Sequence, residues 1–174
     1  GVMYTEHGQP SARFNTSQLE DPAYTAQWVG AAVDQVVANG VDGFQLDVEH
    51  FHSPTPRMKA LFTAFVCSLQ SRLQAANKTL FAVDTQVWGN TAIFDLSALS
   101  ECAEFLIVMA YDLVSKDGNA SSNCPLPMVR DDLAKYYLRA GVPPHKLILA
   151  LPAYGYAFPC AKTGAVTMSR GAAP

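Results

Sequence analysis

The chain has 174 residues, of which 49% are hydrophobic and 16% are charged, so it carries enough apolar material for one sizeable core. Its formal net charge of -3 excludes the basic surface that a nucleic-acid partner needs. No apolar run approaches the roughly 20 residues that span a bilayer, so we expect no membrane partner.

Strand-like and helix-like segments alternate along the chain. Asp21-Pro22 and Thr55-Pro56 predict helix starts, because Asp and Thr cap helices and proline fits the first helical position. In chain order we expect a strand at 2–5, a helix from Asp21 to Gly40, a strand at 41–48, a helix from Thr55 to Leu73, a strand at 79–85, a short helix from Asp95 to Cys102, a strand at 105–111, a helix at 129–140 and a strand at 147–151. The first helix has an apolar stripe formed by Trp28, Ala32, Val36 and Val37.

This alternation predicts the α/β class, with a parallel sheet covered by helices. Two architectures fit the pattern, a doubly wound open sheet and a (β/α)8 TIM barrel. No glycine-rich phosphate fingerprint follows the strands, which removes the commonest reason to choose the doubly wound form. A barrel needs about 250 residues, so the chain can supply only part of one.

The strand at 41–48 leads into a segment in which three polar residues alternate with three apolar ones. Because side chains alternate across a strand, Gln45, Asp47 and Glu49 share one face, and the residues between them share the other. Asp47 and Glu49 are expected roughly 6–7 Å apart along the strand. Two carboxyl groups at that distance can couple, so that one holds its proton near neutral pH and serves as a general acid.

The segment Asp42-Gly-x-x-x-Asp47-x-Glu49 resembles the strand-four signature of the family 18 glycoside hydrolases, the chitinase family. Three further segments, 105–112, 146–156 and 169–174, are similar to later parts of that family's barrel. The resemblance implies that residues 1–174 form one partial catalytic domain, roughly strands three to seven of a TIM barrel, without the first strands and the last one. The chain departs from most of the family at Gln45, where a third acid is usual.

The resemblance also implies a mechanism in which the substrate's own acetamido group attacks the anomeric carbon. Glu49 would be the acid and base, Asp47 would orient the acetamido N–H, and Tyr111 would hold the acetamido carbonyl. The expected substrate is an oligosaccharide that contains N-acetylglucosamine, and no cofactor or metal is expected. Further candidate substrate-binding residues are Gln45, Met109, Asp112, Tyr154 and Trp88.

Two alternatives to an active hydrolase stay open. The chain could be a sugar-binding, lectin-like member, although an intact Glu49 speaks against that. It could also be a fragment that is inactive in isolation. The group Asp47, Glu49, His50 and His52 could suggest a metal site, but its spacing matches no metal motif and we expect none. Asp84 and Gln86 either line the sugar site or only begin a turn.

The cysteines and glycosylation motifs concern the compartment. Cys67 lies in an apolar helix stripe and is expected to be a buried thiol, Cys102 is expected at the non-catalytic end of the barrel, and Cys124 and Cys160 could form a disulfide. Acceptor motifs for N-glycosylation begin at Asn15, Asn77 and Asn119. These features predict a lysosomal or extracellular protein. We also expect the protein to be a monomer.

Overall fold

A computed structural model describes residues 2–4, 16–49, 51, 54–114, 119–158 and 169–171. Within these residues a five-stranded parallel sheet has the order β1-β2-β3-β4-β5. Its strands are β1 (Val2–Tyr4), β2 (Gly43–Leu46), β3 (Leu80–Gln86), β4 (Phe105–Met109) and β5 (Leu147–Ala150). Two short strands, β6 (Gly155–Ala157) and β7 (Ser169–Gly171), form a separate antiparallel pair.

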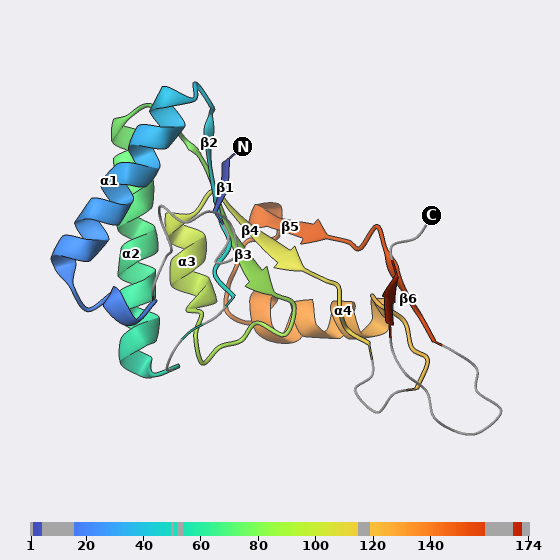
Figure 1. Cartoon of the computed structure of the whole chain (residues 1–174). Helices are drawn as coiled ribbons and strands as arrows, with labels where there is room; N and C mark the ends of the chain where they lie inside the picture. Colours follow the sequence, from blue (N-terminus) through green and yellow to red (C-terminus); the bar gives the residue numbers. More distant parts are fainter. Residues whose placement is uncertain are drawn as a thin grey trace.

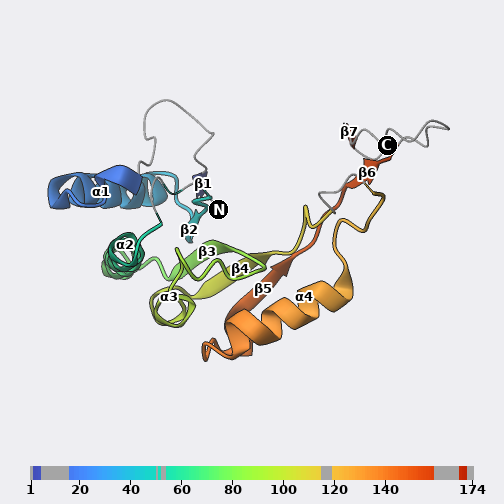
Figure 2. The same cartoon turned by 90° about the horizontal axis from the view of Figure 1, so that it is seen from below.

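The helices connect successive strands of the sheet. They are α1 (Pro22–Ala38), α2 (Pro56–Ala75), α3 (Leu96–Cys102) and α4 (Leu126–Asp132), which continues as the π-helical segment η2 (Leu133–Leu138); η1 (Thr16–Gln18) and η3 (Pro144–Lys146) are single 3₁₀ turns. Figures 1 and 2 show α1, α2, α3 and α4 along one side of the curved sheet. A sequential strand order with helices on one side is the winding of a barrel, since a doubly wound sheet reverses its order. The predicted fold class is confirmed.

The predicted helix starts are also confirmed. Asp21 accepts a hydrogen bond from the backbone N–H of Ala23 at 2.8 Å, and Thr55 Oγ1 accepts one from Met58 at 3.1 Å. Each cap satisfies a backbone donor that the first turn of a helix leaves without a partner. The last predicted helix, at 129–140, is observed three residues earlier, since α4 begins at Leu126 directly after Pro125.

The core lies between the sheet and the helices. Phe44 of β2 and Phe81 of β3 are 3% and 0% exposed, and the Phe44 ring meets the edge of Trp28 from α1 at a centroid distance of 6.1 Å. The sequence prediction was wrong for Val37, which is 52% exposed whereas Val36 is 0% exposed. Adjacent helical residues are about 100° apart around the axis, so only one of the two can face the sheet.

Gly43, the first residue of β2, allows β2 and β3 to approach closely. A Cβ atom at this position would lie 1.6 Å from the carbonyl oxygen of Leu80. No other residue type fits such a gap without moving one of the two strands. The glycine of the Asp-Gly pair therefore sets the strand spacing directly below the acidic segment.

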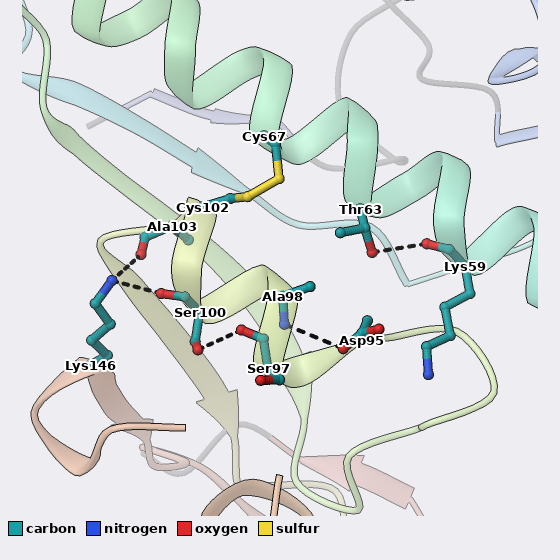
Figure 3. The surroundings of a disulfide bond; sticks show 10 residues. All are labelled: Lys59, Thr63, Cys67, Asp95, Ser97, Ala98, Ser100, Cys102, Ala103 and Lys146. Carbon is teal, nitrogen blue, oxygen red and sulfur yellow. Dashed lines mark hydrogen bonds between the residues drawn. A yellow bond between two sulfur atoms is a disulfide. The ribbon is translucent and has the colours of Figure 1, made fainter. Parts of the chain in front are cut away.

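A disulfide joins Cys67 of α2 to Cys102 at the end of α3, as Figure 3 shows. The prediction that Cys67 is a buried thiol was therefore wrong. Helical spacing indicated an apolar surrounding, but it could not show that α3 places a second cysteine beside it. Cys102 lies just before β4 begins, which confirms the predicted end of the barrel for that residue. Lys146 strengthens the same corner by donating to the carbonyl oxygens of Ser100 and Ala103 at 2.6 and 3.0 Å.

The predicted disulfide between Cys124 and Cys160 stays a prediction, because Cys160 lies outside the described residues. Cys124 has no disulfide partner in the part of the chain that the structure describes. Asn15 lies outside this part as well, whereas Asn77 and Asn119 are exposed. Among the described residues, no helix combines the length and apolarity required to cross a bilayer.

Candidate active site

The polar residues of the acidic segment share one face, as their alternation predicted. Gln45 and Asp47 are half-buried and Glu49 is exposed. The apolar residues between them are 1–4% exposed and pack into the core: Phe44, Leu46 and Val48. Since β2 ends at Leu46, the two acids stand at its carboxyl end. By alternation they lie on the face opposite to Phe44, Leu46 and Val48, which pack into the core. The carboxyl end of a strand is the position at which barrel enzymes carry their catalytic groups.

Asp84 of β3 joins this group. Its two carboxylate oxygens accept hydrogen bonds from Gln45 Nε2 at 3.0 and 2.9 Å, and the residue is only 5% exposed. Burial raises the pKa of Asp84 to about 7, the Gln45 hydrogen bond opposes that shift, and the nearby Asp47 and Glu49 add to it. Asp84 is thus a carboxyl group that titrates near neutrality.

Sequence analysis left Asp84 as either a site residue or a turn residue. The structure assigns it to the interior of β3, which runs two residues further to Gln86. The signal that could have placed Asp84 in the site is the alignment of the two strands. Val83 pairs with Leu46, so the acids that follow them, Asp84 and Asp47, stand at the same level. That signal becomes readable only when the register between the strands is known.

Tyr111 approaches the same acids from the end of β4. It is half-buried, and the edge of its ring faces Tyr154 at a centroid distance of 6.4 Å. Burial raises the pKa of Tyr111, and the charges of Asp84, Asp47, Glu49 and Asp112 raise it further. The phenol therefore keeps its proton and remains a hydrogen-bond donor. The predicted residues Asp47, Glu49 and Tyr111 are therefore near enough to one another for their charges to interact.

Asp112 is held beside Tyr111 in an unusual backbone conformation. Its φ of 58° lies in the left-handed region, which aspartate tolerates better than most residues. Its N–H donates to Asn123 Oδ1 at 2.6 Å. The hydroxyl groups of Tyr154 and Tyr156 both donate to Asp112 Oδ1. We refer to Asp112, Asn123, Tyr154 and Tyr156 as the tyrosine clamp.

Strand alternation does not govern the orientation of Tyr111 and Asp112. Tyr111 and Asp112 would point to opposite faces if β4 continued, but β4 ends at Met109 and the chain turns at Asp112. Asn123 was missed by sequence reasoning, because its role is tertiary: its Nδ2 also donates to the carbonyl oxygen of Tyr154 at 3.1 Å. Burial and the bond to Asp112 raise the pKa of Tyr154 to about 12.

Two further candidates lie at different depths. Met109, the last residue of β4, is 8% exposed and pairs with Gln86 of β3. Trp88 follows β3 and is 45% exposed, so its ring is available to a ligand at the rim. A sugar-stacking role for Trp88 stays a prediction. His50 and His52, from the alternative metal interpretation, lie outside the described residues.

Tyr137 of η2 supports the end of β3 from the helix side. It is 0% exposed, and its hydroxyl lies 2.9 Å from Thr85 Oγ1 and donates to the carbonyl oxygen of Gln86 at 2.5 Å. Gln86 Oε1 in turn accepts from Asn90 at 2.7 Å. These bonds fix the strand end that carries Asp84, so the acid has little freedom to leave its partner Gln45.

The arrangement suits acid–base chemistry on an uncharged, hydroxyl-rich ligand. It offers one exposed carboxyl group, two more embedded ones, a phenol donor and a hydrogen-bonded aspartate, all at the carboxyl ends of parallel strands. The rings of Tyr111, Tyr154 and Tyr156 lie next to one another beside Asp112, and aromatic rings suit the apolar faces of sugar rings.

The chain is similar to known proteins over most of its length. A family model described as glycosyl hydrolases family 18 matches residues 8–172. The chain is 28% identical over 150 residues to di-N-acetylchitobiase of Mus musculus, which covers 80% of the chain and 40% of that protein. It is 25% identical over 150 residues to di-N-acetylchitobiase of Homo sapiens, with 80% and 38% covered.

A solved structure shows the same fold. The group IV chitinase of Ostrinia furnacalis, in complex with allosamidin, superposes with a TM-score of 0.74 at 18% identity, covering 91% of the chain and 48% of that protein. The chain thus spans less than half the length of the relatives that it matches here.

Proposed function

The chain belongs to the family 18 glycosyl hydrolases, and we propose that it cleaves β-1,4-linked N-acetylglucosamine in chitin-type or N-glycan core oligosaccharides. The observation that carries this proposal is the group at the end of β2, where exposed Glu49 stands two residues beyond half-buried Asp47. The charges of both acids act on the Tyr111 hydroxyl. The two relatives named di-N-acetylchitobiase support an N,N'-diacetylated chitobiose unit as the preferred substrate.

In the proposed reaction the substrate supplies the nucleophile. Its acetamido oxygen attacks the anomeric carbon while the glycosidic C–O bond breaks and the Glu49 proton moves to the leaving oxygen. Water then loses a proton to Glu49 and delivers hydroxide to the anomeric carbon, which opens the oxazolinium ring. Configuration is retained because two inversions occur at the same carbon.

Asp47 and Tyr111 would position the acetamido group. The carboxylate of Asp47 can accept the acetamido N–H, and Tyr111 can donate to the acetamido oxygen because its raised pKa keeps the phenol protonated. Holding the two reacting atoms in attack geometry contributes more to such a reaction than a weakly placed external nucleophile. Asp47 also adds negative charge beside the developing oxazolinium cation.

The tyrosine clamp would bind the same sugar through hydroxyl contacts. Both tyrosine hydroxyls donate to Oδ1 of Asp112, and this carboxylate is exposed, so it can also accept from a sugar hydroxyl. Because the tyrosine hydroxyls already hold the Asp112 carboxylate in place, this side chain loses little conformational entropy when a sugar binds. Trp88 would add an aromatic surface at the rim.

The disulfide supports a compartment for the protein. Disulfides persist in oxidising surroundings and are rare in the reducing cytosol. The Cys67–Cys102 bond, together with exposed sequons at Asn77 and Asn119, therefore supports a lysosomal or extracellular location and N-glycosylation at these two sites.

A second candidate is that the 174-residue chain is inactive by itself. Large apolar side chains on α4, on β5 and directly after β5 are 40–72% exposed: Leu126, Met128, Ile148, Leu149 and Leu151. An exposed apolar strand face favours association with further structure over independent function. Under this alternative the chain would fold poorly alone and neither bind nor cleave oligosaccharides.

Hydrolysis of a chromogenic di-N-acetylchitobioside tests the proposal. We expect wild-type protein to release the chromophore and Glu49→Gln to lose at least about 10³-fold in turnover, since the general acid is removed while the side-chain volume is kept. Binding of the disaccharide by Glu49→Gln should stay measurable in calorimetry. Asp34→Asn on the exposed face of α1 is the matched control and should retain wild-type turnover.

The three outcomes are distinct. Binding without turnover in wild-type protein would favour the lectin-like alternative, and neither binding nor turnover would favour the inactive chain. Most of the turnover remaining in Glu49→Gln would remove Glu49 from the role of acid.

A further inference from the structure

Asp84 differs from the other acids of the site in its burial. Asp47 is half-buried and Glu49 is exposed, whereas Asp84 is 5% exposed. Both of its oxygens accept from the same Gln45 amide, at 3.0 and 2.9 Å, across the β2–β3 pair. The two residues form a unit that spans two strands, which we call the amide–carboxyl pair.

The described groups around Asp84 offer no positive charge. β2 and its end contribute Gln45, Asp47 and Glu49, β4 places uncharged Ile107 opposite Asp84, and the end of β4 contributes Tyr111. An amide donor stabilises a carboxylate less than Lys or Arg would, because it has no charge to offer. A buried carboxyl group in such surroundings retains its proton to a much higher pH than usual.

We propose that Asp84 is a proton-holding residue of this active site: oriented by Gln45, it must be neutral for turnover and acts on Glu49 and Asp47 through its charge. The inference rests on the proposed hydrolase function, because Glu49 must be able to release a proton for Asp84 to affect it. Asp84 does not contact the reacting atoms in this account, so it is a positioning residue.

The physical reason is charge accumulation. Once Glu49 has given its proton to the leaving oxygen, Asp47 and Glu49 are both carboxylates. If Asp84 were also ionised, three negative charges would stand on two neighbouring strand ends, which would make Glu49 a weaker acid. With the pKa of Asp84 at about 7, this third charge is absent in acid and appears as the pH rises past neutrality.

Gln45 has a defined part in this arrangement. An amide cannot exchange protons with either neighbouring acid, so the proton on Asp84 stays there and does not move through position 45. An acid at position 45 would place one more negative charge against buried Asp84. The amide instead donates to Asp84 and holds it in place, which also prevents its pKa from rising further.

The pH dependence of kcat/KM tests the inference, measured from about pH 4 to about pH 9 on the chromogenic di-N-acetylchitobioside. In wild-type protein we expect turnover to fall about tenfold per pH unit above neutrality, as one ionisation requires. In Asp84→Asn, where residue 84 is always neutral, kcat/KM should not fall in this way above neutrality, whatever its maximum value is. Gln45→Met should move the descent to higher pH, because the bond that favours ionised Asp84 is gone. Asp34→Asn should follow the wild-type profile.

Carbon-13 NMR of the carboxyl groups provides a readout independent of activity. The Asp84 carboxyl should titrate near neutrality in wild-type protein, and its midpoint should move to lower pH in Glu49→Gln, where a neighbouring charge is removed. The inference is overturned if Asp84→Asn and wild-type protein have the same descent, or if Asp84 titrates as an ordinary aspartate. If Asp84→Asn does not fold, Gln45→Met provides the test. A descent of kcat/KM that does not move to higher pH in Gln45→Met would then overturn the inference. Wild-type protein that does not hydrolyse the substrate, while Asp84 titrates near neutrality, would instead refute the proposed function.

Discussion

The carboxyl groups of the site are held in physically different ways. Asp84 is buried and receives two hydrogen bonds from a neutral amide, whereas Asp112 is exposed and receives two from tyrosine hydroxyls. Burial favours the protonated form of the Asp84 carboxyl group, whereas the Asp112 carboxyl group is open to solvent. Residues of one type therefore serve different roles because their surroundings differ.

The raised pKa of Asp84 has a consequence for stability. Its pKa is 3.8 in the unfolded reference and about 7 in the folded chain, so between these values the folded state binds more protons. The contribution of the Asp84 proton to the free energy of unfolding is therefore fully present below about pH 4. It is lost as the pH rises towards 7, which lowers the free energy of unfolding by up to roughly 4 kcal/mol. Asp84→Asn should remove this dependence and be the more stable protein at neutral pH.

Urea denaturation at acid and neutral pH measures the effect. The difference between Asp84→Asn and wild-type protein should grow as the pH rises, whereas Asp34→Asn should track wild-type protein throughout. A constant difference across this range would show that Asp84 titrates equally in the folded and unfolded chain.

At the scale of elements, the stabilising disulfide and the candidate catalytic acids lie at opposite ends of the strands. The disulfide joins α2 to α3 just before β4 begins, and the acids stand where the strands end. Five residues of β4 separate these levels by roughly 16 Å. Changes at the disulfide should therefore alter stability with little effect on the geometry of the acids.

Cys67→Ser combined with Cys102→Ser should lower the free energy of unfolding by about 3–4 kcal/mol, as expected for a loop of 35 residues. Urea denaturation of the double variant, and of wild-type protein with and without reductant, measures this loss. The NMR titration of Asp84 should be unchanged in whatever fraction remains folded. Equal stability of the oxidised and reduced protein would contradict the assignment.

Elements were predictable where the signal is local. Caps and proline positions marked the starts of α1 and α2, and alternation sorted the faces of β2, because both depend on neighbouring residues. The Cys67–Cys102 bond and the amide–carboxyl pair depend on which elements become neighbours in space. Asn123 carried no signal at all, since an asparagine in a polar loop is ordinary.

At the scale of the whole molecule, the five-stranded sheet presents one helix-covered face and one face that bears the site. The family signature identified the strand that ends just before Asp47 and Glu49, and sequential winding brought the ends of β2, β3 and β4 to one edge. The barrel type followed from the sequence once β-α alternation and the signature agreed. The role of Asp84 did not, because it depends on burial depth, which no sequence pattern reports.

The central claim is that Glu49 supplies the proton while the substrate's acetamido group supplies the nucleophile. Two chromogenic β-1,4-linked disaccharides that differ only at C2 of the cleaved sugar, one with an acetamido group and one with a hydroxyl group, test it most directly. Hydrolysis of the acetamido substrate with retained configuration, and loss of at least about 10³-fold in kcat/KM for the hydroxyl substrate, is the predicted result. Comparable hydrolysis of both disaccharides would contradict it.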